Sequence, residues 1–430
     1  MSGSPVWHPF TQHGLREPIP HVVRSEGAAL FTADGARVID AVSSWWVTTH
    51  GHNHPPIVAA VREAVGRLDQ MIFAGWTHPE AERLAADLVA LVRQELGSDH
   101  LTHVFFSDSG STSVEVALKM ALGTWRGRGE PRHRILVMDN GYHGDTIGAM
   151  SVGARGVFNR AYAPLLFDVS SLPFPTAGRE QATLDALEAA CRAEAPAALI
   201  VEPLALGAGG MLFYAPDVLA DMADICRRHG VLFIADEVMT GWGRTGTMFA
   251  CSQAGVVPDL LCLSKGLTGG LLPLAVTLAS EAVFAAHCST ERQDMFFHSS
   301  SYTANAIACA AANANLAVWR DEPVLGRIDD LVARQDAALA GLAGHPAIGG
   351  QRRLGTIAAM ELGKAGGGYA ATLAPELMAF CRERDVLLRP LGSTVYVMPP
   401  YCIGEDDLTR VYAVIGDAAD RIAESEPLTA

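Results

Sequence analysis

Short apolar runs alternate with amphipathic segments through the middle of the chain. The apolar runs lie in HVFFSDSG, HRILVMDNG, ALIVEPL, VLFIADE, LLCLSKG and LAVTLAS. Between them, apolar residues recur at the spacing of one helix face, as in Val114, Ala117, Leu118, Ala121 and Leu122. Nearly continuous apolar strands separated by helices are typical of a mostly parallel sheet covered on both faces. The pattern therefore predicts an α/β fold.

The two ends of the chain have a different pattern from the middle. Residues 1–50 contain short strand-like runs and turns, whereas residues 326–430 carry a long helical pattern followed by further short runs. We expect a large central domain over residues 51–325. Both ends would then build a smaller α+β domain, with boundaries known to within several residues.

Polar residues follow the apolar runs, where the expected strands end. In parallel sheets the ligand site forms at the carboxyl ends of the strands. The polar groups at these ends are Ser109-Gly110-Ser111, Gly141-Tyr142-His143, Glu202, Asp236 and Lys265. The sequence thus predicts one site at this edge of the sheet.

Asp236 and Lys265 are the most informative pair in the chain. Lys265 follows Leu-Cys-Leu-Ser and precedes Gly266, and Asp236 ends the run VLFIAD. Pyridoxal-phosphate enzymes need a lysine that forms a Schiff base with the cofactor aldehyde, and a carboxylate that keeps the pyridine nitrogen protonated. A solvated lysine in a turn is the alternative for Lys265, but the Asp236 setting favours the cofactor site.

The segment SDSGSTS predicts a phosphate site. It places Gly110, Ser111 and Thr112 between a strand and a helix. Backbone N–H groups and a helix amino end favour an anion there. Thr112 followed by Glu115 also fits a capping box, and both interpretations can hold together.

Composition excludes several classes of partner. The chain has 32 Lys and Arg against 47 Asp and Glu, a net charge of −15, which argues against a nucleic-acid partner. Its 8 cysteines occur singly without a C-x-x-C motif, so we expect reduced thiols and no metal site. Neither a signal peptide nor an apolar run of about 18 residues is present, so we expect a cytoplasmic protein without a membrane partner.

Longer motifs resemble those of a known enzyme family. They are WHPFTQ, SSWWVTTHGHNHP, FSDSGSTSVEVALKMAL, NGYHGDTIGAMSVG, EPLALGAGGM, ADEVMTGWGRTG, LSKGLTGG, RPLG and YVMPPY. Together they run almost end to end. They resemble the subclass III aminotransferases of fold type I, and within these the adenosylmethionine–8-amino-7-oxononanoate aminotransferases of the biotin pathway. The Asp-Glu and Ser-Lys-Gly motifs are shared by the whole subclass, whereas Trp45-Trp46 is more specific.

The resemblance implies cofactor contacts. Lys265 would be the Schiff-base lysine and proton shuttle, and Asp236 would hold the pyridine nitrogen. Gly110 and Ser111 would hold the phosphate, and Tyr142 would cover the ring. Asp145 and Glu202 would orient Tyr142 and the ring. In a homodimer, Ser301 would reach the phosphate of the neighbouring subunit.

The resemblance also implies substrate contacts. Trp45 and Trp46 would line the pocket, with a core or interface role as their alternative. Arg389 would bind a substrate carboxylate, with a plain surface position as its alternative. Gly266 and Phe10 complete the expected contacts. For Arg244, a structural ion pair and a substrate contact are both open.

Two departures from the family pattern bear on the amino donor. Phe10 stands where many members have Tyr, and SSSYTANA (299–306) replaces the usual G-P-T-F-x-G-N-P. Ser301 thereby replaces a threonine, and a serine hydroxyl can make the same hydrogen bond. Some relatives use lysine in place of S-adenosylmethionine, so the departures leave the donor less certain than the acceptor.

The expected reaction is transamination of 8-amino-7-oxononanoate to 7,8-diaminononanoate, with S-adenosylmethionine as donor. Three alternatives stay open at this point. One is another subclass III aminotransferase acting on an ω-amino acid or diamine. Another is a pyridoxal-phosphate aminomutase or decarboxylase. The third is an inactive relative that serves as a binding module.

Overall fold

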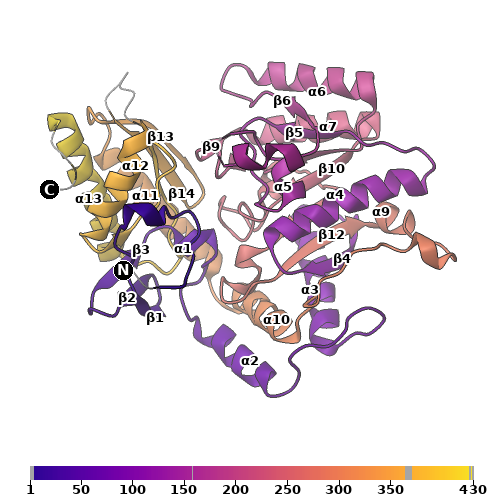
Figure 1. Ribbon diagram of the computed structural model, residues 1–430, viewed down its shortest axis with the longest axis horizontal. Coiled ribbons are helices and arrows are strands. Elements are labelled where there is room, and N and C mark those ends of the chain that lie inside the picture. Colours follow the sequence, from indigo (N-terminus) through magenta and orange to yellow (C-terminus); the bar gives the residue numbers. More distant parts are fainter. Residues whose placement is uncertain (1–3, 157, 364–369, 426–427, 429–430) are drawn as a thin grey trace.

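The structure is a computed structural model that describes residues 4–156, 158–363, 370–425 and 428. Elements from the middle of the chain, purple through magenta to orange in Figure 1, form the larger part of the molecule. Elements from the two ends, indigo and yellow, lie together beside it. In the part of the chain that is described, no helix has the length and apolar character needed to cross a bilayer.

A seven-stranded sheet forms the centre of the larger part. Its strand order is β4-β12-β11-β10-β7-β5-β6. The bounds are β4 Leu101–Ser107, β12 Ala275–Ser280, β11 Leu260–Leu263, β10 Leu232–Asp236, β7 Ala198–Val201, β5 Ile135–Met138 and β6 Ser170–Leu172. Strands β11, β10, β7, β5 and β6 are parallel, whereas β12 runs antiparallel to both β11 and β4. The prediction of a mostly parallel α/β sheet is therefore confirmed.

Helices cover both faces of this sheet because its strands are apolar on both faces. Ile200 and Ile234 pack in one core cluster with α4 (Gly110–Gly127), and Leu199 and Phe233 pack in another with α3, α6 and α7. These helices are α3 Pro79–Leu96, α6 Glu180–Glu194 and α7 Pro216–His229. Of the apolar residues expected on the buried face of α4, only Leu122 is exposed.

The smaller part joins the two ends of the chain. One sheet has the order β1-β2-β3-β15, and β15 from the C-terminal region pairs in parallel with β3, Val386 opposite Ile39. A second sheet has the order β13-β14-β16. The strands are β1 Val22–Glu26, β2 Ala29–Thr32, β3 Arg37–Asp40, β13 Ile348–Leu354, β14 Ile357–Leu362, β15 Val386–Leu387 and β16 Thr394–Val397. The prediction that both ends build a smaller α+β unit is confirmed.

The remaining elements connect or cover these sheets. They are α1 Ser43–Trp46, α2 Pro55–Val65, α5 Ile147–Ser151, β8 Ala205–Leu206, β9 Leu212–Phe213, α8 Ala250–Gln253, α9 Glu281–Ala285, α10 Ala306–Asp321, α11 Val324–Gly341, α12 Ala370–Arg382 and α13 Glu405–Glu424, with 3-10 turns at His13–Leu15, Arg160–Leu165, Lys265–Thr268 and Arg292–Asp294. The expected boundary between residues 325 and 326 falls in the first turn of α11. The division into residues 1–50, 51–325 and 326–430 stays a prediction.

Candidate active site

Asp236 and Lys265 meet at the carboxyl edge of the central sheet. Asp236 is the last residue of β10, and Lys265 begins the 3-10 turn that follows the adjacent parallel strand β11. Both line one cavity with Trp46, Gly110, Ser111, Tyr142, His143, Gly144, Glu202, Val238, Met239 and Ser264. The expected gathering of polar strand ends is thus present in the structure.

Lys265 is a buried amine with an unusual backbone. Its φ of 45° lies in the left-handed region, where a non-glycine residue is strained. Burial lowers the pKa of Lys265, while the charges of Asp236 and Glu202 oppose that shift. A lowered pKa makes the neutral, nucleophilic form of the amine more accessible.

His143 contacts the carboxylate of Asp236, although the sequence analysis assigned it no separate role. Its Nδ1 lies 2.7 Å from Oδ2 of Asp236, and both side chains are buried. The other carboxylate oxygen of Asp236 accepts the N–H of Val238 at 3.1 Å. These contacts orient the carboxylate toward the cavity. The only sequence signal for His143 was its place in Gly-Tyr-His at a strand end.

Glu202 positions the segment that carries Tyr142. Its two carboxylate oxygens accept the N–H of Tyr142 at 2.9 Å and the N–H of Gly207 at 3.0 Å. Burial raises the pKa of Glu202 to about 7, although the charge of His143 opposes the shift. Burial, and then the charge of Asp145, raise the pKa of Tyr142, so its phenol stays protonated.

The amino end of α4 faces the same cavity. Ser109 caps the helix in a capping box with Thr112, so the expected pairing of Thr112 with Glu115 is wrong. Glu115 instead accepts the N–H of Gly148 at 2.8 Å, because its side chain points to the first turn of α5. Gly110 and Ser111 form the first turn, whose N–H groups have no partner within the helix.

Close packing around this helix end requires two glycines. A Cβ on Gly110 would lie 2.6 Å from Cγ1 of Val238, and a Cβ on Gly144 would lie 2.0 Å from Oγ of Ser111. Ser111 Oγ also accepts the N–H of Asp145 at 3.2 Å. The result is a narrow cradle at a helix amino end, which suits a phosphate.

The donor set fits pyridoxal phosphate. The cavity presents a buried amine for the aldehyde, a His-supported carboxylate for the pyridine nitrogen and a helix amino end for the phosphate. Tyr142 adds a half-buried aromatic residue to the lining of the same cavity. Each polar part of the cofactor therefore has a matching group on the protein.

The two adjacent tryptophans face different surroundings. Trp46 is buried, donates its indole N–H to the Tyr396 hydroxyl at 3.0 Å, and has its ring centroid 5.4 Å from Nζ of Lys265. Trp45 is 40% exposed, and Cζ of Arg389 lies 4.6 Å from its ring centroid. Phe10 packs against Trp45 with ring centroids 5.3 Å apart. Phe10, Trp45 and Arg389 thus form one cluster, which Trp46 connects to Lys265.

Two other expected contacts lie elsewhere. Gly266 packs against Trp242, since a Cβ on Gly266 would lie 2.7 Å from Cβ of Trp242, and its contact with substrate stays a prediction. Ser301 is exposed, and its carbonyl accepts the side-chain N–H of Gln70 at 2.9 Å. Ser301 is not among the residues that line the cavity of its own chain. Its contact with a neighbouring subunit stays a prediction.

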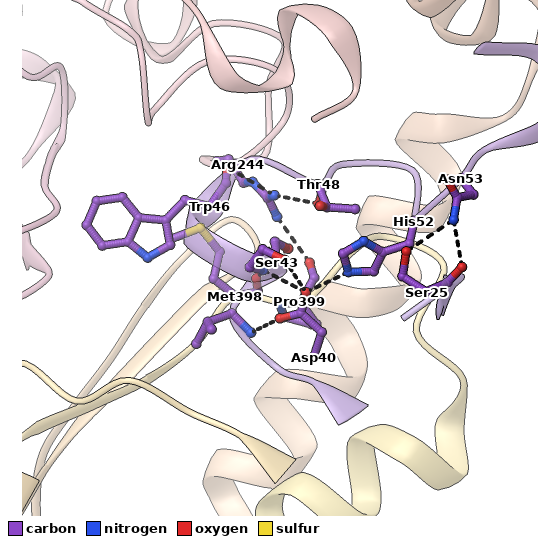
Figure 2. A network of polar contacts seen from close by, with 12 residues as sticks. Ser25, Asp40, Ser43, Trp46, Thr48, His52, Asn53, Arg244, Met398 and Pro399 are labelled. Atoms are coloured by element: carbon purple, nitrogen blue, oxygen red, sulfur yellow. Dashed lines mark hydrogen bonds and ion pairs between the residues drawn. The ribbon is translucent and has the colours of Figure 1, made fainter. Parts of the chain in front are cut away.

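Arg244 has a structural role of an unexpected kind. The guanidinium is buried and donates to the carbonyls of Thr48 at 2.9 Å and Pro399 at 3.0 Å, with Trp46 O at 3.5 Å (Figure 2). Carbonyl oxygens, and not a carboxylate or the cavity, receive this side chain. Arg244 therefore forms neither the expected ion pair nor the expected substrate contact among the described residues. It links the backbone at Thr48 to the backbone at Pro399.

Comparisons with known proteins agree with this site. Residues 11–418 match the family described as aminotransferase class-III. The chain is 46% identical over 429 residues to the adenosylmethionine-8-amino-7-oxononanoate aminotransferase of Synechococcus elongatus, covering 97% of this chain and 99% of the relative. It is 40% identical to the enzyme of the same name from Nitratidesulfovibrio vulgaris, covering 97% and 80%.

Solved structures show the same fold. The adenosylmethionine-8-amino-7-oxononanoate aminotransferase of Methanocaldococcus jannaschii is 30% identical with a TM-score of 0.91, covering 97% of each chain. An amine transaminase from an uncultivated Pseudomonas species, solved with pyridoxal phosphate bound, is 31% identical with a TM-score of 0.91, covering 98% of this chain and 99% of the other. The chain belongs to the class-III aminotransferases, pyridoxal-phosphate enzymes of fold type I, and within them to the family of the adenosylmethionine-8-amino-7-oxononanoate aminotransferases.

Proposed function

We propose that this enzyme transfers an amino group from S-adenosylmethionine to the ketone of 8-amino-7-oxononanoate, yielding 7,8-diaminononanoate for biotin synthesis. The observation that carries the proposal is the near-complete match, at 46% identity, to a relative named for this reaction. The cluster of Phe10, Trp45 and Arg389 supports it independently, because Trp45 is next in the chain to Trp46, which lines the Lys265 cavity.

The roles of the cofactor-facing residues follow from their surroundings. Bound pyridoxal phosphate supplies an electron-poor ring that stabilises negative charge on the carbon next to the reacting nitrogen. Asp236, oriented by His143, keeps a proton on the pyridine nitrogen. Lys265, with its lowered pKa, accepts a proton from the α-carbon of the donor and later delivers one to C7 of the acceptor.

The remaining cavity residues bind and orient. The N–H groups of Gly110 and Ser111 receive the phosphate, and Tyr142 covers one face of the ring. The carboxylate of Glu202 fixes the backbone at Tyr142 through the hydrogen bond described above. Each of these groups belongs to a different strand end, so the sheet itself sets their spacing.

The acceptor is a chain of methylenes that ends in a carboxylate. Burial of each CH₂ against an indole contributes about 0.8 kcal/mol. The guanidinium of Arg389, held over Trp45, offers paired N–H groups to the terminal carboxylate. A short keto acid such as pyruvate can pair its carboxylate with Arg389, but it has no methylene chain to bury against the indoles.

For the donor, the proposal is S-adenosylmethionine in preference to lysine. Phe10 removes a hydroxyl that a primary amine could have used, and it lies against Trp45 with its ring centroid 5.8 Å from Cζ of Arg389. The altered loop at residues 299–306 contributes no side chain to the cavity of its own chain. A donor with a large, partly apolar cation suits these aromatic rings better than a bare ammonium.

The proposal is tested by following each half of the reaction separately. The aldehyde form of the bound cofactor absorbs visible light, and the amine form does not. S-adenosylmethionine should bleach this absorbance faster than lysine or β-alanine, and 8-amino-7-oxononanoate should restore it better than pyruvate. Faster bleaching by lysine would replace the donor. Better recovery with pyruvate would favour the alternative, an amine transaminase of general specificity.

A further inference from the structure

The turn that carries the two tryptophans has a strained backbone. In α1, Ser43 has a φ of 53°, Ser44 of 59° and Trp46 of 65°, and Trp45 between them is not helical either (φ −126°, ψ 58°). These are left-handed values that residues with a Cβ adopt at a cost, and the segment contains no glycine. Such a turn persists only where surrounding contacts impose it.

Asp40 supplies the contacts at the start of this turn. Its side chain is fully buried. One carboxylate oxygen accepts the N–H of Val42 at 3.2 Å, and the other accepts the N–H of Ser44 at 2.6 Å and its hydroxyl at 3.2 Å. A single carboxylate thereby fixes one peptide group before the strained residues and one within them.

His52 contacts the carboxylate of Asp40. Its Nε2 lies 2.9 Å from the same oxygen that accepts from Ser44, so one oxygen serves three partners. The histidine comes from the loop after the turn, and the aspartate from the end of β3. Figure 2 shows the imidazole directed at the carboxylate. The pair therefore ties the two ends of the tryptophan segment together.

Other hydrogen bonds hold the turn at Ser43 and at Thr48. The hydroxyl of Ser43 donates to the carbonyl of Met398 at 2.8 Å, and the guanidinium of Arg244 donates to the carbonyl of Thr48. These contacts fix the backbone on either side of the indoles. At the peptide between Ser43 and Ser44, the carbonyl accepts the N–H of Val47 at 3.0 Å and that of Thr48 at 3.3 Å. Among the described residues, Asp40 is the group that accepts the N–H of Ser44.

We propose that Asp40, oriented by His52, is a positioning residue that sets the placement of both indoles and thereby the affinity for the acceptor. The inference rests on the proposed function, since it assigns the indoles to the acceptor chain. Asp40 does not line the cavity, so it acts through Trp45 and Trp46. Loss of its ties lets the turn relax, which moves the apolar wall away from Lys265 and displaces the ring beneath Arg389.

The test uses Asp40→Asn in the holoenzyme. An amide has one acceptor oxygen in place of two, so it cannot receive Val42, Ser44 and His52 together. The KM for 8-amino-7-oxononanoate should rise about 10-fold, the factor that corresponds to 1.4 kcal/mol. At the same time kcat should stay within about two-fold and the Kd for pyridoxal phosphate should not change. Asp34→Asn, an acidic residue in the turn between β2 and β3, is the matched control with native constants.

A second measurement needs no substrate. Protein labelled with 5-fluorotryptophan contains 7 labelled indoles, and Trp45→Phe and Trp46→Phe assign two of the fluorine resonances. Asp40→Asn should shift or broaden these two and leave the rest in place. Unmoved resonances of Trp45 and Trp46 would overturn the proposal whatever the substrate is. A wild-type enzyme that ignores 8-amino-7-oxononanoate would instead overturn the proposed function.

A purely structural role for Asp40 predicts a different result. In that case kcat and cofactor affinity would fall together with stability, and the KM for the acceptor would not rise, which also overturns the proposal. Should Asp40→Asn fail to fold, His52→Ala removes the outer support alone and should raise the same KM by about three-fold. His52→Gln, which keeps an N–H donor at similar reach, should bring the KM back toward the native value. If His52→Ala changes neither the KM nor the resonances of Trp45 and Trp46, the proposed role of His52 in orienting Asp40 is wrong.

Discussion

At the scale of single residues, the sequence predicts chemistry where a side chain is unusual in its own setting. Lys265 and Asp236 each follow an apolar run, so the pair could be identified from the sequence. His143 could not, because its partner Asp236 lies on another strand and only the crossover order brings them together. The stacking of Arg389 on Trp45 could not be predicted either, because the two residues are far apart in the sequence. The pairing of β3 with β15 brings their segments together.

Asp236→Asn tests the role of the carboxylate. The amide cannot keep a proton on the pyridine nitrogen, so turnover should fall by roughly 10²–10⁴-fold, the range for loss of a positioned proton. The fold and most of the cofactor affinity should remain, since the phosphate cradle is untouched. Steady-state kinetics, together with the visible absorbance of bound pyridoxal phosphate, separate the two effects. Near-native turnover would assign the carboxylate another role.

His50 predicts a pH dependence of stability. Burial is the main cause that lowers its pKa from 6.5 to about 3, and its Nε2 lies 2.9 Å from the side-chain oxygen of Asn315. The unfolded chain therefore binds a proton that the folded chain does not, between pH 6.5 and about 3. The stabilising contribution is complete above pH 6.5 and is lost as the pH falls toward 3.

His50→Gln should remove this part of the acid sensitivity. For one proton, the free energy of unfolding changes by at most about 1.4 kcal/mol per pH unit. Urea unfolding of the cofactor-free wild type and variant at several pH values gives the two slopes. The variant should lose less stability than the wild type on acidification. Equal slopes would mean that His50 is protonated in the folded protein.

At the scale of elements, the strongest signals came from apolar runs and helix periodicity. Each predicted run is a strand of the central sheet, and α4 begins at the predicted Gly110. The reversed direction of β12 could not be predicted, because a strand buried on both faces has the same pattern in either direction. Strand β6 has only three residues, Ser-Ser-Leu, too few for any periodicity. The turn at Ser43–Trp46 has left-handed residues without a glycine, so the sequence carries no local signal for it.

Gly144 lies in the loop after β5 and packs against Ser111 at the amino end of α4. Gly144→Ala would place a methyl group 2.0 Å from Oγ of Ser111 and force a Cβ onto a φ of 128°. The first turn of α4 must then shift, so the Kd for pyridoxal phosphate should rise by at least about 10-fold, or roughly 1.4 kcal/mol. Equilibrium dialysis of the cofactor measures it. Gly156→Ala is the control, because no atom lies within 4 Å of the added methyl group.

At the scale of the whole molecule, the sequence predicted that both ends build one small unit, and the pairing of β3 with β15 confirms it. The assembly between subunits stays a prediction. Light scattering should give twice the 45.6 kDa of one chain. An active species with the mass of a single chain would contradict the dimer.

Mixed dimers test whether Ser301 serves the neighbouring subunit. Ser301→Ala alone should weaken cofactor binding at both sites, and Lys265→Ala alone should abolish turnover. If Ser301 acts across the interface, a dimer of one Ser301→Ala chain and one Lys265→Ala chain contains one wholly native site. Refolding an equal mixture should therefore restore activity at limiting pyridoxal phosphate above that of Ser301→Ala itself. Without such recovery, Ser301 acts within its own chain or not at all.

The pairing of β3 with β15 also has a consequence for how the chain is made. Val386 emerges from the ribosome 386 − 39 = 347 residues after its partner Ile39. At about 5–20 residues per second, the first strands wait roughly 20–70 s for a neighbour. During translation β3 therefore has a free edge, which is open to pairing with other chains until β15 arrives. The tryptophan turn that follows β3 is among the first segments synthesised and among the last to be completed.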